Sequence, residues 1–180
     1  MYFIEHNKLS REDPELDHHI LYLQSTRGCP YSCSYCIETM YHDLYKGLGK
    51  FIRRRSVDSI IKEVNIHLNR PNNRKVRVYF VDEVFGSAPG FIDEFAHRYR
   101  KEVGLPFDVM YHPKSLKAKT IGKLAEAGVK EINFGMQTGS DQIRNNVFTR
   151  PGNNAEIIEL TKAINEHNIN IRYDLILDND

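Results

Sequence analysis

The sequence lacks the features that mark exported, membrane-bound or histidine-coordinated proteins. Its 180 residues include eight histidines, none of them in the H-x3-H spacing that places two metal ligands on one helix face. No apolar run approaches the ~18 residues that a membrane-spanning helix needs. Residues 1–6 also lack the basic start and apolar core of a signal peptide. We therefore expect neither export nor a membrane partner.

An excess of charge of one sign is absent as well. The formal net charge is +1, so no overall field attracts nucleic acid or an anionic membrane, and a nucleic-acid partner is not indicated. Hydrophobic residues make up 41% of the chain and charged residues 27%, which is ordinary for a globular protein. We predict one folded core over residues 19–180, preceded by a polar lead-in or linker remnant over residues 1–18.

Cysteine is scarce, and all of it lies in one short stretch. The three cysteines are Cys29, Cys33 and Cys36. An odd number of clustered thiols fits a disulfide framework badly, whereas exported proteins of this size tend to pair their cysteines. The cysteine content therefore predicts a reducing compartment, the cytoplasm.

Strand-like and helix-like segments alternate along the rest of the chain. Apolar or β-branched runs predict strands over residues 20–23, 76–81, 107–112, 129–136 and 169–177. Apolar side chains at helical spacing predict helices between them, beginning near residues 57, 91, 116 and 154. The expected N-caps are Ser56, Ser115 and Asn153, and Gly128 is expected to end the third helix. This alternation predicts an α/β fold with a parallel sheet.

Polar residues gather just past the ends of the predicted strands. They are the three cysteines, Asp82, Glu83, His112, Gln137, Ser140 and Asp178. Parallel α/β sheets bind their ligands at the edge formed by the carboxyl ends of the strands. We therefore expect these residues to share one functional edge of the sheet.

The cysteines follow the first strand with the spacing C-x3-C-x2-C, directly after Gly28. Three thiolates on one loop can bind three irons of a cubane cluster, which normally takes four protein thiolates. The remaining iron would then be open to a small molecule. Two other interpretations stay open from the residues alone: unligated core thiols, and a zinc site completed by His42.

The motif resembles the signature of the radical S-adenosylmethionine (radical SAM) superfamily, C-x3-C-x-aromatic-C, which Cys29, Cys33, Tyr35 and Cys36 match. Four further segments are similar to that family: Arg53-x-Arg55-Ser56, Asp82-Glu83-x-Phe85, residues 135–140 and residues 173–178. They are most similar to the branch that often carries a cobalamin-binding domain and to the methylthiotransferases. The resemblance implies a partial (β/α) barrel, with about five of six units present and the C-terminal part missing.

The resemblance also implies a chemistry and a set of ligands. A [4Fe–4S] cluster on Cys29, Cys33 and Cys36 would serve the reductive cleavage of SAM to a 5′-deoxyadenosyl radical, in an oxygen-sensitive enzyme. The implied SAM contacts are Tyr35 at the adenine, Asp82 and Glu83 at the amino group, Gln137 and Ser140 at the ribose or carboxylate, and Arg150 at the carboxylate. A low-potential flavodoxin or ferredoxin would donate the electron. The full-length protein could also use cobalamin, for methyl or methylthio transfer to an unknown substrate.

Each of these residues also has a structural interpretation. Tyr35 could be a packing aromatic, Asp82 and Glu83 a helix cap, and Gln137 and Ser140 partners in loop hydrogen bonds. Arg150 could lie on the surface, His112 could be a satisfied histidine, and Arg53–Arg55 could be a solvated helix start or a phosphate or partner contact. For the whole chain, the alternatives are a cluster-binding fragment without turnover and a zinc-binding interaction domain.

Overall fold

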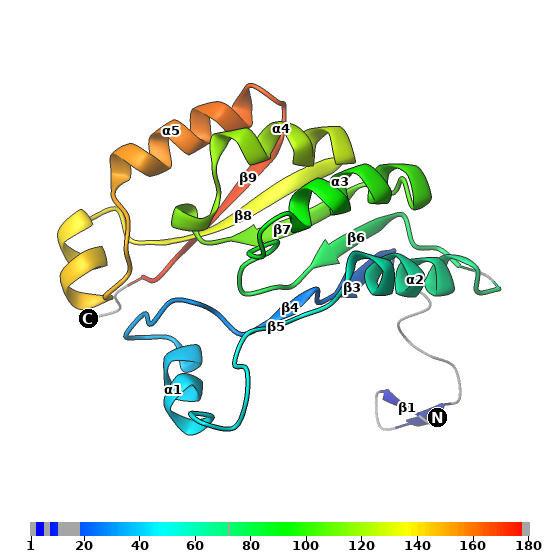
Figure 1. Ribbon diagram of the computed structural model, residues 1–180, viewed down its shortest axis with the longest axis horizontal. Coiled ribbons are helices and arrows are strands. Elements are labelled where there is room, and N and C mark those ends of the chain that lie inside the picture. Colours follow the sequence, from blue (N-terminus) through cyan, green and yellow to red (C-terminus); the bar gives the residue numbers. More distant parts are fainter. Residues whose placement is uncertain (1–2, 6–7, 11–18, 72, 178–180) are drawn as a thin grey trace.

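A computed structural model of the chain describes residues 3–5, 8–10, 19–71 and 73–177. Its main feature is a sheet of five strands in the order β3 (Ile20–Leu23), β6 (Arg77–Phe80), β7 (Phe107–Tyr111), β8 (Val129–Gln137) and β9 (Asn170–Leu175). Every neighbouring pair in it is parallel. The sheet is open, so the described residues form an α/β partial barrel, as predicted (Figure 1).

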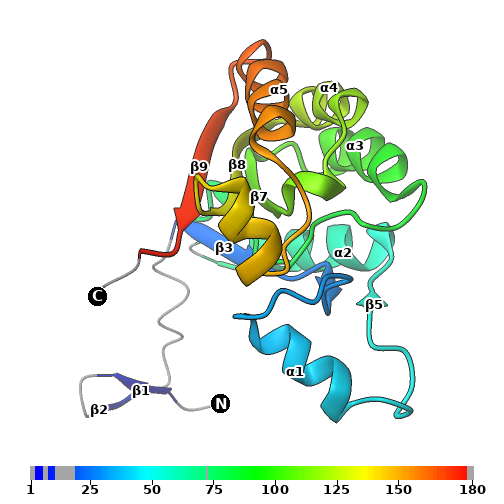
Figure 2. The same ribbon diagram turned by 90° about the vertical axis from the view of Figure 1, so that its left-hand side faces the viewer.

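Four helices connect the strands and cover one face of this sheet (Figure 2). They are α2 (Val57–Leu68), α3 (Phe91–Glu102), α4 (Ala118–Ala127) and α5 (Asn154–Asn165). The predicted caps of two are confirmed: Ser56 accepts a hydrogen bond from the Ser59 amide, and Asn153 accepts one from the Glu156 amide. Gly128 ends α4 with a φ of 103°, as expected.

The predicted N-cap at Ser115 is wrong. This residue lies in a short 3-10 helix (Pro113–Ser115), and α4 begins three residues later, after Lys117. The Ser115 hydroxyl is instead 2.7 Å from the hydroxyl of Tyr31, in the cysteine-containing loop. A hydroxyl that can cap a helix can equally bond to a distant side chain, and here the tertiary contact is the one that forms.

The core that holds the sheet edge in place is aromatic. Phe80 of β6 packs against Phe85, Phe95 and Phe107, with ring centroids 4.9 to 5.9 Å apart, and all four side chains are fully buried. Truncating such a buried phenylalanine to alanine typically costs about 3–5 kcal/mol of stability. The carboxyl end of β6, at Phe80, and the start of β7, at Phe107, are therefore rigidly placed.

Several short elements were not expected from the sequence. Helix α1 (Ile37–Leu44) follows the cysteines, and β4 (Thr26–Arg27) pairs with β5 (Arg53–Arg54) in an antiparallel ladder. Within the lead-in, β1 (Phe3–Glu5) pairs with β2 (Lys8–Ser10). Among the described residues, no helix has both the length and the hydrophobicity to cross a membrane. Asp178, an expected edge residue, lies outside the described residues.

Candidate cofactor site

The cysteines lie on a loop, residues 28–36, that leaves the carboxyl end of the first sheet strand through β4 and enters α1 (Figure 1). Cys36 is the N-cap residue of α1, and its amide donates to the Cys33 carbonyl over 3.0 Å. Thr39 of α1 also bonds to that carbonyl, through its hydroxyl, over 2.7 Å. All three thiols are free; Cys33 is buried and the other two are partly exposed.

Gly28 is required where the loop begins. Its φ is +92°, and a Cβ added there would lie 2.8 Å from the carbonyl oxygen of Phe51. Any other residue would therefore strain the backbone and collide with the segment that follows α1. A glycine is needed before the first cysteine because the backbone of the cysteine loop approaches the backbone at Phe51 closely here.

The cysteine loop is fastened on two sides. On one side, the ring of Tyr31 stacks on His112 with centroids 3.8 Å apart, next to its bond with Ser115. On the other side, the Ser34 amide donates to Phe148 over 3.0 Å and the Thr149 hydroxyl donates to Ser32 over 3.0 Å. Both anchors come from the carboxyl edge of the sheet, so the three thiols are held beside it.

Arg150 connects the cysteine loop to β8. It is buried, with 8% of its surface exposed, and Nη1 donates to Cys33 Sγ over 3.4 Å and to the Tyr35 hydroxyl over 3.2 Å. Nη2 donates to the carbonyl of Gly135 over 2.5 Å. A Cβ on Gly135 would lie 2.8 Å from Nη2, so this glycine makes room for the guanidinium. The surface alternative for Arg150 is therefore wrong.

Asp82 is fully buried beneath the start of the cysteine loop. Its Oδ1 accepts from the Ser25 hydroxyl over 2.8 Å and from the Thr26 amide, and its Oδ2 has no hydrogen-bond partner among the described residues. Burial raises the pKa of this carboxyl to about 6. The contacts of Asp82 thus position the chain that leads into the cysteines.

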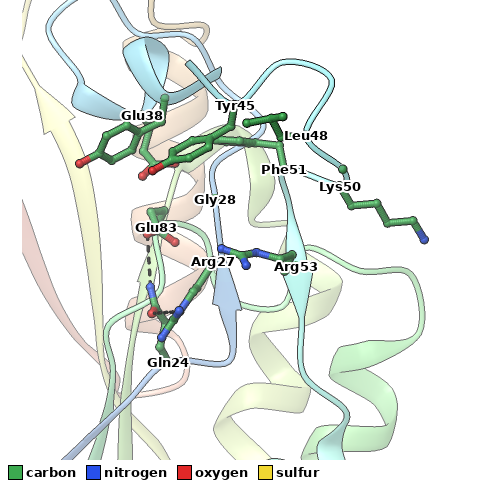
Figure 3. A pocket seen from close by; sticks show the side chains of 12 residues that line it. Gln24, Arg27, Gly28, Glu38, Tyr45, Leu48, Lys50, Phe51, Arg53 and Glu83 are labelled. Atoms are coloured by element: carbon green, nitrogen blue, oxygen red, sulfur yellow. Dashed lines mark hydrogen bonds between the residues drawn. The ribbon is translucent and has the colours of Figure 1, made fainter. Parts of the chain in front are cut away.

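Glu83 faces a different environment. Its Oε1 accepts from Gln24 Nε2 over 3.3 Å, and its Oε2 is buried without a hydrogen-bond partner in the described part of the chain. Burial raises the pKa of this carboxyl above its usual value. Glu83 lines a pocket of about 540 Å³ together with Gln24, Arg27, Gly28 and Glu38 (Figure 3). An unmet buried acceptor beside a pocket is a candidate ligand contact.

Of the remaining expected SAM contacts, Gln137 and Ser140 lie at or after the end of β8, and Tyr35 lies in the cysteine loop. Gln137 ends this strand with a φ of 67°, and its Nε2 would lie 2.6 Å from a Cβ on Gly135, so it approaches Arg150 there. Ser140 accepts from the Ile143 amide over 3.3 Å, which is the loop hydrogen bond named as its alternative. Tyr35 is 40% exposed, with its ring edge-on to Phe148 at 5.1 Å. Tyr35, Gln137 and Arg150 are thus close together.

The two histidines that the sequence analysis named, His112 and His42, each contact a backbone group. His112 Nδ1 accepts from the Lys114 amide over 3.1 Å, and burial lowers the pKa of the ring to about 3, so it is neutral and carries its proton on Nε2. His42 Nε2 lies 2.7 Å from the Cys29 carbonyl and must donate to it. Because a donating nitrogen has no free lone pair there, this contact disfavours His42 as a zinc ligand through Nε2.

The donor set fits an iron–sulfur cubane better than a single ion. No group of three His, Cys, Asp or Glu side chains in the described ranges surrounds one point closely enough to hold one ion. A cubane does not need this, because each thiolate binds a different iron. Burial raises the pKa of Cys29 to about 11, so its proton would leave on metal binding.

Several residues near the cysteines were not predicted from the sequence. Glu38 Oε2 accepts from the Cys29 amide over 3.3 Å, and Thr39 bonds to the cysteine loop. Helical spacing of Ile37, Met40, Tyr41 and Leu44 would have revealed α1, which carries both. Gly135 could not have been found in this way, because its role depends on Arg150.

Comparison with known proteins agrees with this arrangement. The Radical SAM superfamily matches residues 23–179, and the chain belongs to this superfamily. It is 27% identical over 116 residues to bacteriochlorophyllide d C-12(1)-methyltransferase of Chlorobaculum tepidum, and this alignment covers 63% of this chain and 24% of that protein. It is 23% identical over 155 residues to cytidylyl-2-hydroxyethylphosphonate methyltransferase of Streptomyces wedmorensis. This alignment covers 81% of this chain and 26% of that protein.

The fold is similar to that of OxsB, a cobalamin-dependent S-adenosylmethionine radical enzyme whose structure holds aqua-cobalamin. The TM-score is 0.70 at 22% identity, over 87% of this chain and 23% of OxsB. At this identity the likeness shows the fold alone. The chain thus spans about a quarter of the length of each of these relatives.

Proposed function

We propose that this chain is the core of an enzyme that cleaves SAM reductively, using a [4Fe–4S] cluster held by Cys29, Cys33 and Cys36. The observation that carries the proposal is the cysteine loop: it holds three free thiols, is fastened on two sides to the carboxyl edge of the sheet and is contacted by Arg150. When bound, the cluster supplies the electron that breaks the S–C5′ bond, which gives methionine and a 5′-deoxyadenosyl radical.

We assign the SAM contacts from the polar atoms that lack a partner among the described residues and from the side-chain faces that are exposed. The unmet Oε2 of Glu83 can accept from the SAM ammonium group, and the exposed face of Tyr35 can pack near the adenine. Gln137 and Ser140 would meet the ribose or the carboxylate, with Arg150 at their side. Asp82 Oδ2 also has no partner among the described residues and can accept from the same ammonium group, while its Oδ1 holds Ser25 and Thr26 ahead of the loop.

Methyl transfer is the end use that we propose, because two relatives are named as methyltransferases and OxsB is named as cobalamin-dependent. Cobalamin would then bind through another part of a longer protein or through another chain. A low-potential flavodoxin or ferredoxin would supply the electron. We place the protein in the cytoplasm, where three unpaired thiols stay reduced.

The test is anaerobic reconstitution of the 180-residue chain with iron and sulfide, followed by addition of SAM and dithionite. We expect about four irons per chain, an EPR signal of the reduced cluster that changes when SAM is added, and release of 5′-deoxyadenosine. Stoichiometric zinc without iron would refute the proposal. A SAM-responsive cluster without 5′-deoxyadenosine would instead identify the chain as a cluster-binding fragment without turnover.

A further inference from the structure

The ladder between β4 and β5 sets two arginines opposite each other. Its register pairs Arg27 with Arg53 and Thr26 with Arg54. Directly opposite residues of an antiparallel pair have their side chains on the same face, about 4.5–5.5 Å apart at Cβ. Arg27 and Arg53 are therefore neighbours on one face, and both line the pocket of about 540 Å³, whereas Arg54 does not line it.

Two like charges opposite each other destabilise such a ladder unless something neutralises them. Among the described residues, neither Arg27 nor Arg53 forms an ion pair; the one side-chain partner of the two is Gln24, whose Oε1 is 3.2 Å from Arg27 Nε. Two arginines nearby or on the helices do have carboxylate partners: Arg55 pairs with Glu63, and Arg98 with Glu102.

Two carboxylates, Glu38 and Glu83, line the same pocket, and their hydrogen-bond donors within the chain are neutral groups. Glu38 Oε2 accepts from the Cys29 amide, and Glu83 Oε1 accepts from Gln24. Arg27 interacts electrostatically with Glu83 and partly offsets the effect of burial on the pKa of that carboxyl, and Lys50 extends away from the pocket (Figure 3), so Arg53 is the charged group here that has no opposite charge among the described residues. A bound anion would supply that charge.

The wall opposite the arginines is apolar. Tyr45, Leu48 and Phe51, from the end of α1 and the segment after it, form a shelf that faces Arg27 and Arg53 across the pocket (Figure 3). Tyr45 is 49% exposed and Leu48 77% exposed, so large apolar surface is open here. Apolar walls with a few convergent polar groups are the usual form of a small-molecule site.

We propose that this arginine pocket binds an organic oxyanion, with its charged group between Arg27 and Arg53 and its apolar body against Tyr45 and Leu48. Guanidinium groups suit phosphate, phosphonate and carboxylate because their planar N–H forks donate two parallel hydrogen bonds. The site adjoins the cysteine loop through Gly28 and shares Glu83 as a wall. It does not depend on the cluster chemistry proposed above.

The experiment is calorimetric titration of the full chain at low ionic strength with phenyl phosphate, inorganic phosphate and phenol as separate probes. We expect phenyl phosphate to bind more tightly than either fragment. Arg27→Gln and Arg53→Gln should each weaken phenyl phosphate about tenfold or more, which is the scale of one charge-assisted hydrogen bond. Tyr45→Ala should weaken phenyl phosphate while leaving inorganic phosphate unchanged.

Arg54→Gln is the matched control, because it removes the same charge from the other face of the same ladder. It should leave the affinity for phenyl phosphate unchanged, and thermal melts should show that each variant is folded. Equal weakening by all three arginine variants would show attraction to a basic surface only and would overturn the proposal. Absence of binding, or displacement of the probe by SAM one for one, would also overturn it.

Discussion

The guanidinium of Arg150 lies 3.4 Å from the thiol of Cys33, although 117 positions separate the two residues in the sequence. The same guanidinium bonds to the Tyr35 hydroxyl and to the carbonyl of Gly135, so one buried side chain joins the cysteine loop to the end of β8. A positive N–H donor on a ligating sulfur stabilises the more negative, reduced form of a cluster. Arg150 therefore positions the loop, and in the proposed cluster it would favour reduction.

Arg150→Gln should lower the midpoint potential of the reconstituted cluster. Loss of one N–H···S hydrogen bond, about 0.5–1.5 kcal/mol, corresponds to roughly 20–60 mV for a one-electron couple. The measurement is an EPR-monitored redox titration of the protein without SAM. The control is Arg172→Gln, which removes an exposed arginine of β9 that pairs with Glu131 of β8. This variant should leave the potential unchanged. An unchanged potential in Arg150→Gln would contradict this role.

Cys33→Ala should abolish cluster assembly while the helices persist. Cys33 is the buried member of the three, but its side chain is small, and the core lies elsewhere, around Phe80 and Phe95. The measurements are iron and sulfide per chain after reconstitution, and far-UV circular dichroism. Retention of four irons per chain in this variant would contradict the assigned ligands.

Gly28→Ala should impair both stability and cluster loading, because its Cβ would meet the Phe51 carbonyl and its φ is +92°. Gly49→Ala is the matched control: its φ is +111°, but nothing lies within 4 Å of the added Cβ. The control should lose about 1–2 kcal/mol of unfolding free energy from backbone strain alone. Gly28→Ala should lose more and bind less iron; equal losses would mean that the close contact has no consequence.

Asp82 should make the protein less stable as the pH rises. The folded-state pKa is about 6, above the usual 3.8, so protonated Asp82 favours folding below pH 4, and this contribution disappears between pH 4 and pH 6. The loss is about 3 kcal/mol. Urea unfolding of the metal-free chain and of Asp82→Asn across this range should show that the difference in unfolding free energy between the two proteins changes by this amount. A constant difference between the two proteins would contradict it.

Most of the sheet and its helices could be predicted because their signals are local. The alternation of β-rich runs with 3.6-residue apolar periods, together with caps at Ser56, Asn153 and Gly128, is written within a few residues of each element. The short elements near the site escaped for two reasons: β4 and β5 are too short to show a period, and α1, although its apolar residues have helical spacing, has no side-chain cap at its N-terminus. Strands β4 and β5 are two residues each, and α1 buries none of its side chains.

The candidate site, too, was predicted from the sequence only in part. The cysteine spacing and the polar residues after each strand predicted that these side chains gather at the carboxyl edge of the sheet, but Ser115 contacts Tyr31 and caps no helix, and Arg150 is buried against Cys33. Each of these side chains can satisfy its hydrogen bonds in more than one way. Which partner it meets depends on how distant segments pack.

The sequence by itself determined the strand and helix order, the loop that holds three thiols, and membership of a superfamily recognisable from its motif, since propensity, caps and spacing act over short stretches of chain. Only the tertiary structure decided that Arg150 contacts Cys33, that Arg27 faces Arg53, and that Glu83 keeps an unmet oxygen at a pocket. These relationships follow from strand register and long-range packing, which no short stretch of chain encodes.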